Sequence, residues 1–391
     1  MERIPILGKL TPGKTQRHLI RLPGAALAKD EPRPVISVAG AKPGPVLFVN
    51  AGVHGGEYPA VEAVIRLAKT LDPKKISGTM ILMPVLNLPA FRTRTPFVCP
   101  IDNVNPNRVF PGDPRGSYSE QMTHACINEF VVHADAYVDL HGGDIPEALV
   151  PFVICRAGND EVAKKSKAIA MAFGLPYVLT VNKPVQPSKG HRARAGGLSS
   201  YAAAADKGTP AILAEAGGVG QMQEEAVALL INGVVNVMRD LGMIDDARFE
   251  SQTETNSKPK PKRTARSTVA TTVLTKFEWL YTKNAGLWYP KVAPGDVVNE
   301  GEQIGRVGDL FRRHVGRNCF VGERRCTFSD DQSIRTREWV THGNRSGITS
   351  NSRLRVRRAF LGVAAKCRAR ALFGNTFTRP TDRSRKVSQL R

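Results

Sequence analysis

Short apolar runs alternate with segments of helical periodicity from Pro34 to about Gly242, and this alternation constrains the fold more than any other feature of the chain. Five apolar runs are predicted to be strands: residues 46–50, 79–85, 136–140, 151–155 and 211–214. Four further segments carry an apolar stripe at helical spacing: residues 59–71, 119–133, 160–173 and 222–241. Strands and helices that alternate in this way pack as layers around a sheet, so the sequence predicts an α/β architecture.

The length of the chain adds a second expectation. Its 391 residues exceed what one compact core usually holds, which favours a large domain followed by a smaller one. Apolar residues make up 41% of the chain and charged residues 23%, and this balance excludes a wholly disordered, collagenous or coiled-coil protein. We therefore assign residues 1–250 to the α/β domain.

Two segments of different composition follow the α/β domain. Residues 251–268 are rich in Lys, Pro, Ser and Thr and nearly free of apolar side chains, which is typical of a solvated linker. Residues 269–311 combine β-branched and aromatic residues with turn signals such as Pro294-Gly295, and this pattern predicts the start of a small β domain. The strands that would complete this domain are not recognisable in the sequence, so we expect the β domain to be incomplete.

The last part of the chain is distinguished by its charge. Residues 312–391 hold 18 Arg, 2 Lys and 5 acidic residues, whereas residues 1–311 hold 36 basic and 30 acidic residues. Most of the formal net charge of +21 therefore belongs to this Arg-rich tail. Three interpretations stay open: a basic arm for nucleic acid or acidic lipid, a disordered extension, and a segment read out of frame with one that encoded a folded domain.

Other features of the sequence bear on the compartment. The longest nearly uncharged apolar stretch, Met80 to Phe91, is far shorter than the roughly 20 residues of a membrane-spanning helix, and no secretory signal is evident. We therefore expect a cytoplasmic protein without a membrane partner. The six cysteines have no paired spacing, which indicates neither a disulfide framework nor a thiolate zinc module.

Four polar side chains stand just past the ends of three predicted strands. His54 and Glu57 follow the first of the five runs, His141 follows the third and Glu215 the fifth. In an open α/β sheet, ligands and catalytic groups gather at the carboxyl ends of strands. Catalytic zinc commonly takes two histidines and one carboxylate, so the pattern is compatible with a metal site assembled from these three strand ends, with His54 and Glu57 as its clearest pair. A turn histidine followed by a helix-starting glutamate would give the same local pattern.

Glu215 lies in the segment AEAGGVG, whose glycines let the backbone turn sharply and approach a ligand. It is predicted to act as the general base that takes a proton from a water activated by zinc. A carboxylate that starts the helix at 222–241 is the alternative interpretation. Asp139 and Asp144 flank His141 and are candidates to orient it, with a loop cap favoured for Asp144.

A loop interrupted by prolines, PIDNVNPNRVFPG, holds a candidate substrate grip. Asn107 and Arg108 offer an amide and a rigid bidentate guanidinium, which suit a substrate carboxylate. Arg92 stands nearby in the sequence and is predicted to serve the oxyanion that develops during acyl transfer, with Arg94 as the alternative. Arginines on an ordinary surface give the same pattern.

In their order along the chain, four segments resemble the succinylglutamate desuccinylase and aspartoacylase family, within the zinc carboxypeptidase superfamily. They are HGGE at 54–57, NPNRVFPG at 105–112, DLHGGD at 139–144 and EAGG at 215–218. The resemblance spans roughly residues 30–310 and implies a mixed central sheet flanked by helices. It also implies a small β domain that contributes to the substrate pocket or to assembly, and it is compatible with a homo-oligomer.

The resemblance assigns an activity and a role to individual residues. It implies hydrolysis of the amide bond of N-acyl amino acids or related small compounds, with Zn2+ as cofactor. His54, Glu57 and His141 match the family's zinc ligands. Glu215 matches its catalytic glutamate, and Asn107 and Arg108 match the pair that binds a substrate carboxylate. Pro106 stands where the family often has an aliphatic residue, and we expect this difference to affect the loop and substrate choice.

We therefore predict a zinc-dependent amidohydrolase that removes an N-acyl group from an N-acyl amino acid or a related small carboxylate. Two other functions stay open on the sequence alone. A zinc carboxypeptidase needs the same metal and the same grip on a carboxylate but accepts peptides. A non-catalytic nucleic-acid-associated protein would act through the Arg-rich tail, with binding that falls steeply as salt rises. Because the tail lacks interleaved aromatic residues, we do not expect a nucleic-acid partner.

Overall fold

The structure is a computed structural model of the whole chain. It describes residues 4–182, 197–245, 271–280, 286–299 and 301–308, together with three strands at 319–320, 334–340 and 357–365. The predicted linker at 251–268 lies outside the described residues, as does most of the Arg-rich tail.

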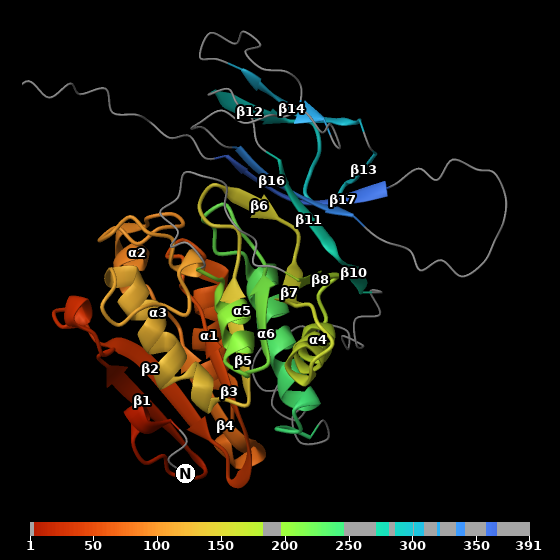
Figure 1. Cartoon of the computed structure of the whole chain (residues 1–391). Coiled ribbons are helices and arrows are strands. Elements are labelled where there is room, and N and C mark those ends of the chain that lie inside the picture. Colours follow the sequence, from red (N-terminus) through yellow and green to blue (C-terminus); the bar gives the residue numbers. More distant parts are fainter. Residues whose placement is uncertain are drawn as a thin grey trace, which may run out of the picture.

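A nine-stranded mixed sheet forms the centre of the molecule (Figure 1). Its strands lie in the order β1-β2-β4-β3-β5-β9-β7-β8-β10. Their bounds are β1 (Lys14–Ile20), β2 (Arg33–Ala39), β3 (Lys42–Asn50), β4 (Ser77–Met83), β5 (Ala136–His141), β7 (Phe152–Arg156), β8 (Tyr177–Val181), β9 (Ala211–Glu215) and β10 (Thr272–Leu274). The β1–β2, β2–β4 and β7–β9 pairs are antiparallel, and the other five are parallel.

The three strands in the middle of this sheet, β3, β5 and β9, run parallel to one another. Every residue of β5 and β9 is buried, as expected for strands that are covered on both faces. Parallel strands end at the same edge of a sheet, so the loops that follow β3, β5 and β9 converge. This edge carries the candidate site.

Helices cover both faces of the large sheet and bury an apolar core on each side. Those on one face are α1 (Tyr58–Thr70), α4 (Glu161–Phe173) and α6 (Glu224–Asp240), and those on the other are α3 (Tyr118–Glu129) and α5 (Ser200–Asp206). A further short helix, α2 (Leu88–Thr93), follows β4. The 3₁₀ helices among the described residues are η1 (Pro5–Leu7), η2 (Ala25–Leu27), η3 (Pro73–Lys75), η4 (Pro106–Arg108) and η5 (Val131–His133).

Local sequence signals explain where these helices begin. Pro59 occupies the first turn of α1, where its missing N–H costs nothing. A capping box starts α3, in which Ser117 accepts from the N–H of Glu120 and the Glu120 side chain accepts from the N–H of Ser117. Asp160 caps α4, and the left-handed Gly174 ends it.

Two smaller sheets lie above the large one in Figure 1. The first joins β11 (Lys276–Leu280), β16 (Ile334–Val340), β17 (Arg357–Ala365) and β13 (Val297–Asn299), and β17 also pairs with β6 (Glu147–Leu149). The second joins β12 (Leu287–Pro290), β14 (Gln303–Gly308) and β15 (Cys319–Phe320). Because β6 follows β5 closely, the β6–β17 pairing connects the first small sheet to the segment that leaves the candidate site.

The predicted α/β fold, with its mixed central sheet and flanking helices, is confirmed. The five predicted strands correspond to β3, β4, β5, β7 and β9, and the four predicted helices correspond to α1, α3, α4 and α6. Strand β1 was not predicted, because its residues are mostly polar and form an exposed edge strand. Strand β10 was not predicted either; it extends the large sheet although its residues fall in the segment assigned to the small β domain. The domain boundaries stay predictions.

Two smaller expectations concern membranes and thiols. Over the part of the chain that the structure describes, none of the helices has the length and apolar character needed to cross a bilayer. Cys99, Cys126 and Cys155 are buried free thiols, in line with the absence of paired cysteine spacing.

Candidate active site

The candidate site lies where β3, β5 and β9 end. His141 closes β5 and is the register partner of Glu215, which closes β9. The loop after β3 carries His54 and Glu57, and Glu57 is the N-cap residue of α1. This loop fits tightly against α2, because a Cβ atom added at Gly55 would lie only 2.2 Å from the backbone carbon of Ala90.

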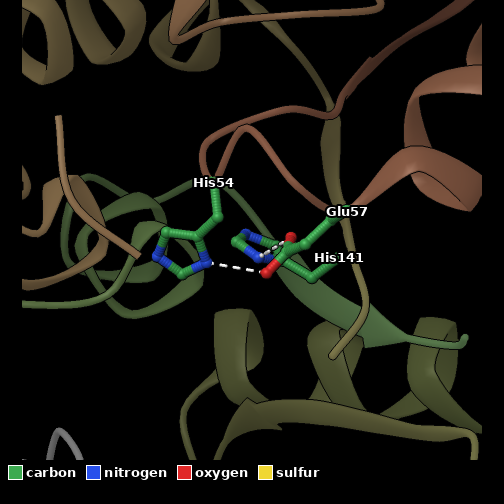
Figure 2. A group of neighbouring side chains, drawn as sticks. All are labelled: His54, Glu57 and His141. Atoms are coloured by element: carbon green, nitrogen blue, oxygen red, sulfur yellow. Dashed lines mark hydrogen bonds and ion pairs between the residues drawn. The ribbon is translucent and has the colours of Figure 1, made fainter. Parts of the chain in front are cut away.

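Three predicted metal ligands come together at this edge. The candidate ligand atoms of His54, Glu57 and His141 all lie within 4.8 Å of one another, and all three residues are buried. Both histidines turn their Nδ1 atoms toward the carboxylate, as Figure 2 shows: His54 Nδ1 is 2.8 Å from Glu57 Oε1, and His141 Nδ1 is 2.8 Å from Glu57 Oε2.

The opposite nitrogen of His54 faces a side-chain oxygen that is fixed as an acceptor. Asn105 Oδ1 accepts a hydrogen bond of 2.9 Å from the backbone N–H of Asn107, a group that can only donate. The same oxygen lies 3.1 Å from His54 Nε2. His54 Nε2 therefore carries the hydrogen, and in the neutral ring Nδ1 keeps the lone pair that faces Glu57.

His141 is held in the same way by a carboxylate. Its Nε2 atom lies 3.0 Å from Asp139 Oδ2, and Asp139 is fully buried. An ionised carboxylate only accepts, so Nε2 donates and the lone pair of the neutral ring again lies on Nδ1. The orienting role considered for Asp139 in the sequence analysis is thus supported by a direct contact.

This donor set fits a metal cation. In their neutral forms, two imidazole lone pairs would face two carboxylate oxygens, and such a group of acceptors requires a positive charge between them. Within the described residues Glu57 Oε2 also accepts no hydrogen bond of good geometry, although it is buried and close to His141. Two imidazole nitrogens and one carboxylate are a ligand set that could hold a metal ion.

Electrostatics of the metal-free site point the same way. Burial alone would raise the pKa of Glu57, but the facing His141 and His54 overcome this effect and hold that pKa at about 2. Burial lowers the pKa of His141, whereas Asp139 and Glu57 more than compensate and place it well above its ordinary value. Without metal the site therefore holds protons, which a bound metal ion would displace.

Glu215 lies beside this cluster. It is 6% exposed and ends β9, in register with His141 on the neighbouring strand. The chain then turns through Gly217, whose φ of 78° favours glycine. Its place next to the candidate ligands suits a general base, and this role stays a prediction.

Asn107 and Arg108 lie on η4 and are both buried. Asn107 Oδ1 accepts a hydrogen bond of 2.9 Å from the backbone N–H of Ser200, so the Nδ2 amide of Asn107 is the end that suits a substrate carboxylate. Arg108 Nη1 donates to the carbonyl oxygen of Asn107 at 2.6 Å. Pro106 starts η4, and the Asn105 cap fixes the turn that follows it.

The two arginines considered for the oxyanion lie elsewhere. Arg92 is near the end of α2 with its side chain 54% exposed, and its guanidinium pairs with both carboxylate oxygens of Glu31. Arg94 is the C-cap residue of α2, in a left-handed conformation with φ of 52°. The contacts of the described residues do not join either arginine to the metal-ligand cluster, and the oxyanion role stays a prediction.

The side chain of Asp144 caps two loops, and the hydrogen bonds of the described residues do not join it to His141. Its Oδ1 accepts from the N–H of Ile145 and its Oδ2 from the N–H of Phe97, both at 2.7 Å. Phe97 has an unusual positive φ of 60°, and its ring meets the His54 ring edge-on with centroids 6.0 Å apart. The loop-cap role favoured from the sequence is confirmed for Asp144.

A family model for the succinylglutamate desuccinylase/aspartoacylase catalytic domain matches residues 43–241, about half of the chain. This segment contains the buried His-Glu-His cluster, Glu215 and the loop with Asn107 and Arg108. The chain belongs to the succinylglutamate desuccinylase/aspartoacylase family. The resemblance stated from four short segments is thereby confirmed.

Individual proteins resemble this chain over most of its length. One curated relative is the N-alpha-acetyl-L-2,4-diaminobutyric acid deacetylase of Halomonas elongata, 27% identical over 286 residues, which are 72% of this chain and 75% of the relative.

Two solved structures share the fold. A succinylglutamate desuccinylase/aspartoacylase from Rhodobacter sphaeroides has a TM-score of 0.64 at 21% identity and covers 90% of this chain and 98% of its own. The ectoine utilization protein EutE (DoeB) from Ruegeria pomeroyi, in a product-bound structure, has a TM-score of 0.62 at 22% identity, with coverages of 91% and 98%.

Sequence reasoning did not find every residue that this family member uses to build the site. Asn105 lies inside a segment that was singled out, and an asparagine before a proline that starts a helical turn is a recognisable cap signal. Ser200 and Phe97 carried no such signal. Their contacts join residues 47 to 93 positions apart, which only tertiary packing decides.

Proposed function

We propose that this protein is a zinc-dependent amidohydrolase that removes an N-acyl group from an N-acyl amino acid. The observation that carries the proposal is the buried cluster of His54, Glu57 and His141, whose Nδ1 and carboxylate atoms converge while Nε2 of each histidine is held by an acceptor. Membership of the desuccinylase/aspartoacylase family supports the same reaction class.

His54, Glu57 and His141 would hold the zinc ion. When bound, zinc lowers the pKa of a water molecule toward neutrality and polarises the acyl carbonyl. A carboxylate oxygen of Glu215 takes the proton of the attacking water and later delivers it to the nitrogen of the departing amine.

Other residues of the chain would orient the substrate. The Nδ2 amide of Asn107 and the guanidinium of Arg108 bind the carboxylate that marks the substrate. If Arg92 stabilises the negative charge that develops on the acyl oxygen, its guanidinium must exchange Glu31 for the substrate. Because this ion pair is exposed, breaking it loses little free energy.

The substrate class follows from charge and from kinship. A buried amide and arginine select for a carboxylate, which N-acyl amino acids carry. The curated relative is named for deacetylation of N-alpha-acetyl-L-2,4-diaminobutyric acid, so this compound is our first candidate among the N-acetyl amino acids.

The proposal is tested by measuring primary-amine release from N-acetyl, N-succinyl and N-formyl amino acids, including N-alpha-acetyl-L-2,4-diaminobutyrate, with zinc-loaded protein. The matched control is Glu215→Gln, which keeps the shape of the side chain but has no basic carboxylate. We expect the variant to retain zinc and to lose a factor of about 100 to 10,000 in kcat.

A panel of peptides with free C-termini accompanies the amides. Cleavage of the peptides alone would replace the deacylase assignment with a carboxypeptidase. Zinc-containing, folded protein that releases no amine from any compound would contradict both, and unchanged kcat in Glu215→Gln would remove Glu215 from the mechanism.

A further inference from the structure

The two candidate metal-binding histidines both contact Glu57, and a series of hydrogen bonds through other residues also connects them. From His54, hydrogen bonds lead through Asn105 to the backbone N–H of Asn107. Asn107 Oδ1 accepts from the N–H of Ser200, and the Ser200 hydroxyl donates to Asp139 Oδ2. Asp139 Oδ2 also holds His141 Nε2. Since both histidines contact Glu57, the chain of contacts closes into a ring.

Ser200 is the point where this ring passes from the substrate loop to the metal site. It begins α5 and is fully buried, so water does not compete for its hydrogen bonds. Its backbone N–H and its hydroxyl act in different directions, one toward Asn107 and the other toward Asp139. A single residue thus orients a candidate substrate ligand and the carboxylate that orients His141.

Asp139 depends strongly on the Ser200 hydroxyl. Its carboxylate is fully buried, and a buried charge needs several donors to offset its loss of water. Within the described residues, His141 and Ser200 both donate to Oδ2 of this side chain, and the buried Tyr137 hydroxyl also interacts with Asp139. Loss of the hydroxyl of Ser200 would remove one of the two donors that hold Oδ2.

We propose that Ser200 is a positioning residue that ties the orientation of His141 to the substrate-binding loop through Asp139 and Asn107. This inference deepens the proposed function and rests on it for the metal site. Ser200 touches neither metal nor substrate in this arrangement. Its effect is transmitted by two hydrogen bonds, so it should be visible in metal affinity in the absence of any substrate.

The first experiment measures zinc affinity by competition with a chromophoric chelator, using full-length protein that has been freed of metal. Ser200→Ala removes the hydroxyl and keeps the backbone N–H. Because loss of a partner behind a metal ligand typically costs 10- to 100-fold in affinity, we expect zinc binding about tenfold weaker than in the wild type.

The matched control is Ser199→Ala. Ser199 is the neighbouring residue, is also buried, and makes no side-chain hydrogen bond to cap α5. Ser199→Ala also removes one hydroxyl at the start of α5, but not the one that donates to Asp139. Its zinc affinity should therefore stay within twofold of the wild type. Equal losses in Ser199→Ala and Ser200→Ala would show a general effect on α5 and overturn the proposal.

The second experiment tests transmission to the substrate loop. Asn107→Leu removes the acceptor for the Ser200 N–H, and we expect it to weaken zinc binding severalfold although Asn107 is not a ligand. In the Ser200→Ala background the same change should cost at least threefold less, because the route is already broken. Strict additivity of the two substitutions would contradict the coupling.

A third variant guards against loss of folding. Ser200→Cys fills the site with a weaker donor and should give a zinc affinity between those of the wild type and Ser200→Ala. Thermal melts of each metal-free variant report folding separately. Wild-type zinc affinity in folded Ser200→Ala would overturn the inference and leave the proposed function intact. Weaker zinc binding in Ser200→Ala, in a protein that hydrolyses no amide, would support the inference and contradict the proposed function.

Discussion

The two candidate histidine ligands each use one ring nitrogen for a hydrogen bond and turn the other toward Glu57. Asn105 and Asp139 are the acceptors that decide which nitrogen is which. The choice matters because a ring nitrogen that carries a hydrogen cannot bind a metal. The residues behind the ligands therefore do as much to define the site as the ligands themselves.

His141→Ala should abolish stable metal binding. It removes one of three ligands and leaves the buried Asp139 and Glu57 without a shared partner. We expect zinc retained after dialysis to fall from about one equivalent to a trace, as measured by elemental analysis. His133→Ala, on η5, is the control and should keep its zinc. Full occupancy in His141→Ala would contradict the ligand assignment.

Arg108→Ala should distinguish substrates by their charge. A hydrogen bond to a charged group contributes about 1.5–3 kcal/mol, so KM for a substrate with a free carboxylate should rise by about 10- to 100-fold. The corresponding amide-capped compound should be affected much less. Arg115→Ala, an exposed arginine after the same loop, serves as control. Equal effects on charged and uncharged substrates would argue against a carboxylate grip.

Among the single elements, the loop from β3 to α1 carries two of the candidate ligands, His54 and Glu57, so its backbone conformation must be fixed. It is pinned to the loop after β4 by backbone hydrogen bonds from Leu86 to Ala51 and from Asn87 to Gly52. The Asn87 side chain adds a bond to the carbonyl of Val53, next to His54. The ligands sit on a short connection that is fixed by its neighbours.

Gly55→Ala should disturb this loop more than an ordinary glycine substitution. The added methyl group would meet the backbone of Ala90 and Phe91 at 2.2–2.4 Å, and backbone cannot move aside cheaply. We expect a loss of about 1–3 kcal/mol in urea unfolding together with weaker zinc binding. Gly208→Ala, which has open space but a φ of 90°, should lower stability alone. Normal zinc affinity in Gly55→Ala would show that the loop tolerates the change.

At the scale of the whole molecule, strands from the far end of the sequence complete the smaller sheets. β11 pairs with β16, and β6, from the segment just after His141, pairs with β17. Both partners lie beyond residue 311, in the Arg-rich part of the chain. Edge strands that lose their partners present unpaired backbone groups and tend to associate.

A chain that ends at residue 311 should therefore aggregate more readily than the full-length protein. Light scattering on size-exclusion chromatography measures this directly, and the monomeric fraction should still bind zinc, because every candidate ligand belongs to the large sheet and its loops. A truncated protein that stays monomeric at concentrations where the full chain does would show that these strand pairings contribute little.

Local patterns in the sequence were enough to predict the strands of the sheet centre and the residue types near their ends. Apolar runs such as 136–140 are local signals; His141 and Glu215 follow such runs directly, and His54 and Glu57 stand a few residues beyond one. These features could be predicted because a buried strand and its C-terminal residue are read from one short segment.

The partners of these residues, in contrast, follow from tertiary packing. The links from Asn105 to His54 and from Ser200 to Asn107 and Asp139 span 51 to 93 positions, and no local pattern encodes them. The pairing of Arg92 with Glu31 and the addition of β10 to the large sheet are likewise long-range. Hydrogen-bond partners depend on which surfaces are buried against each other, and that is settled only when the whole sheet and its helices pack.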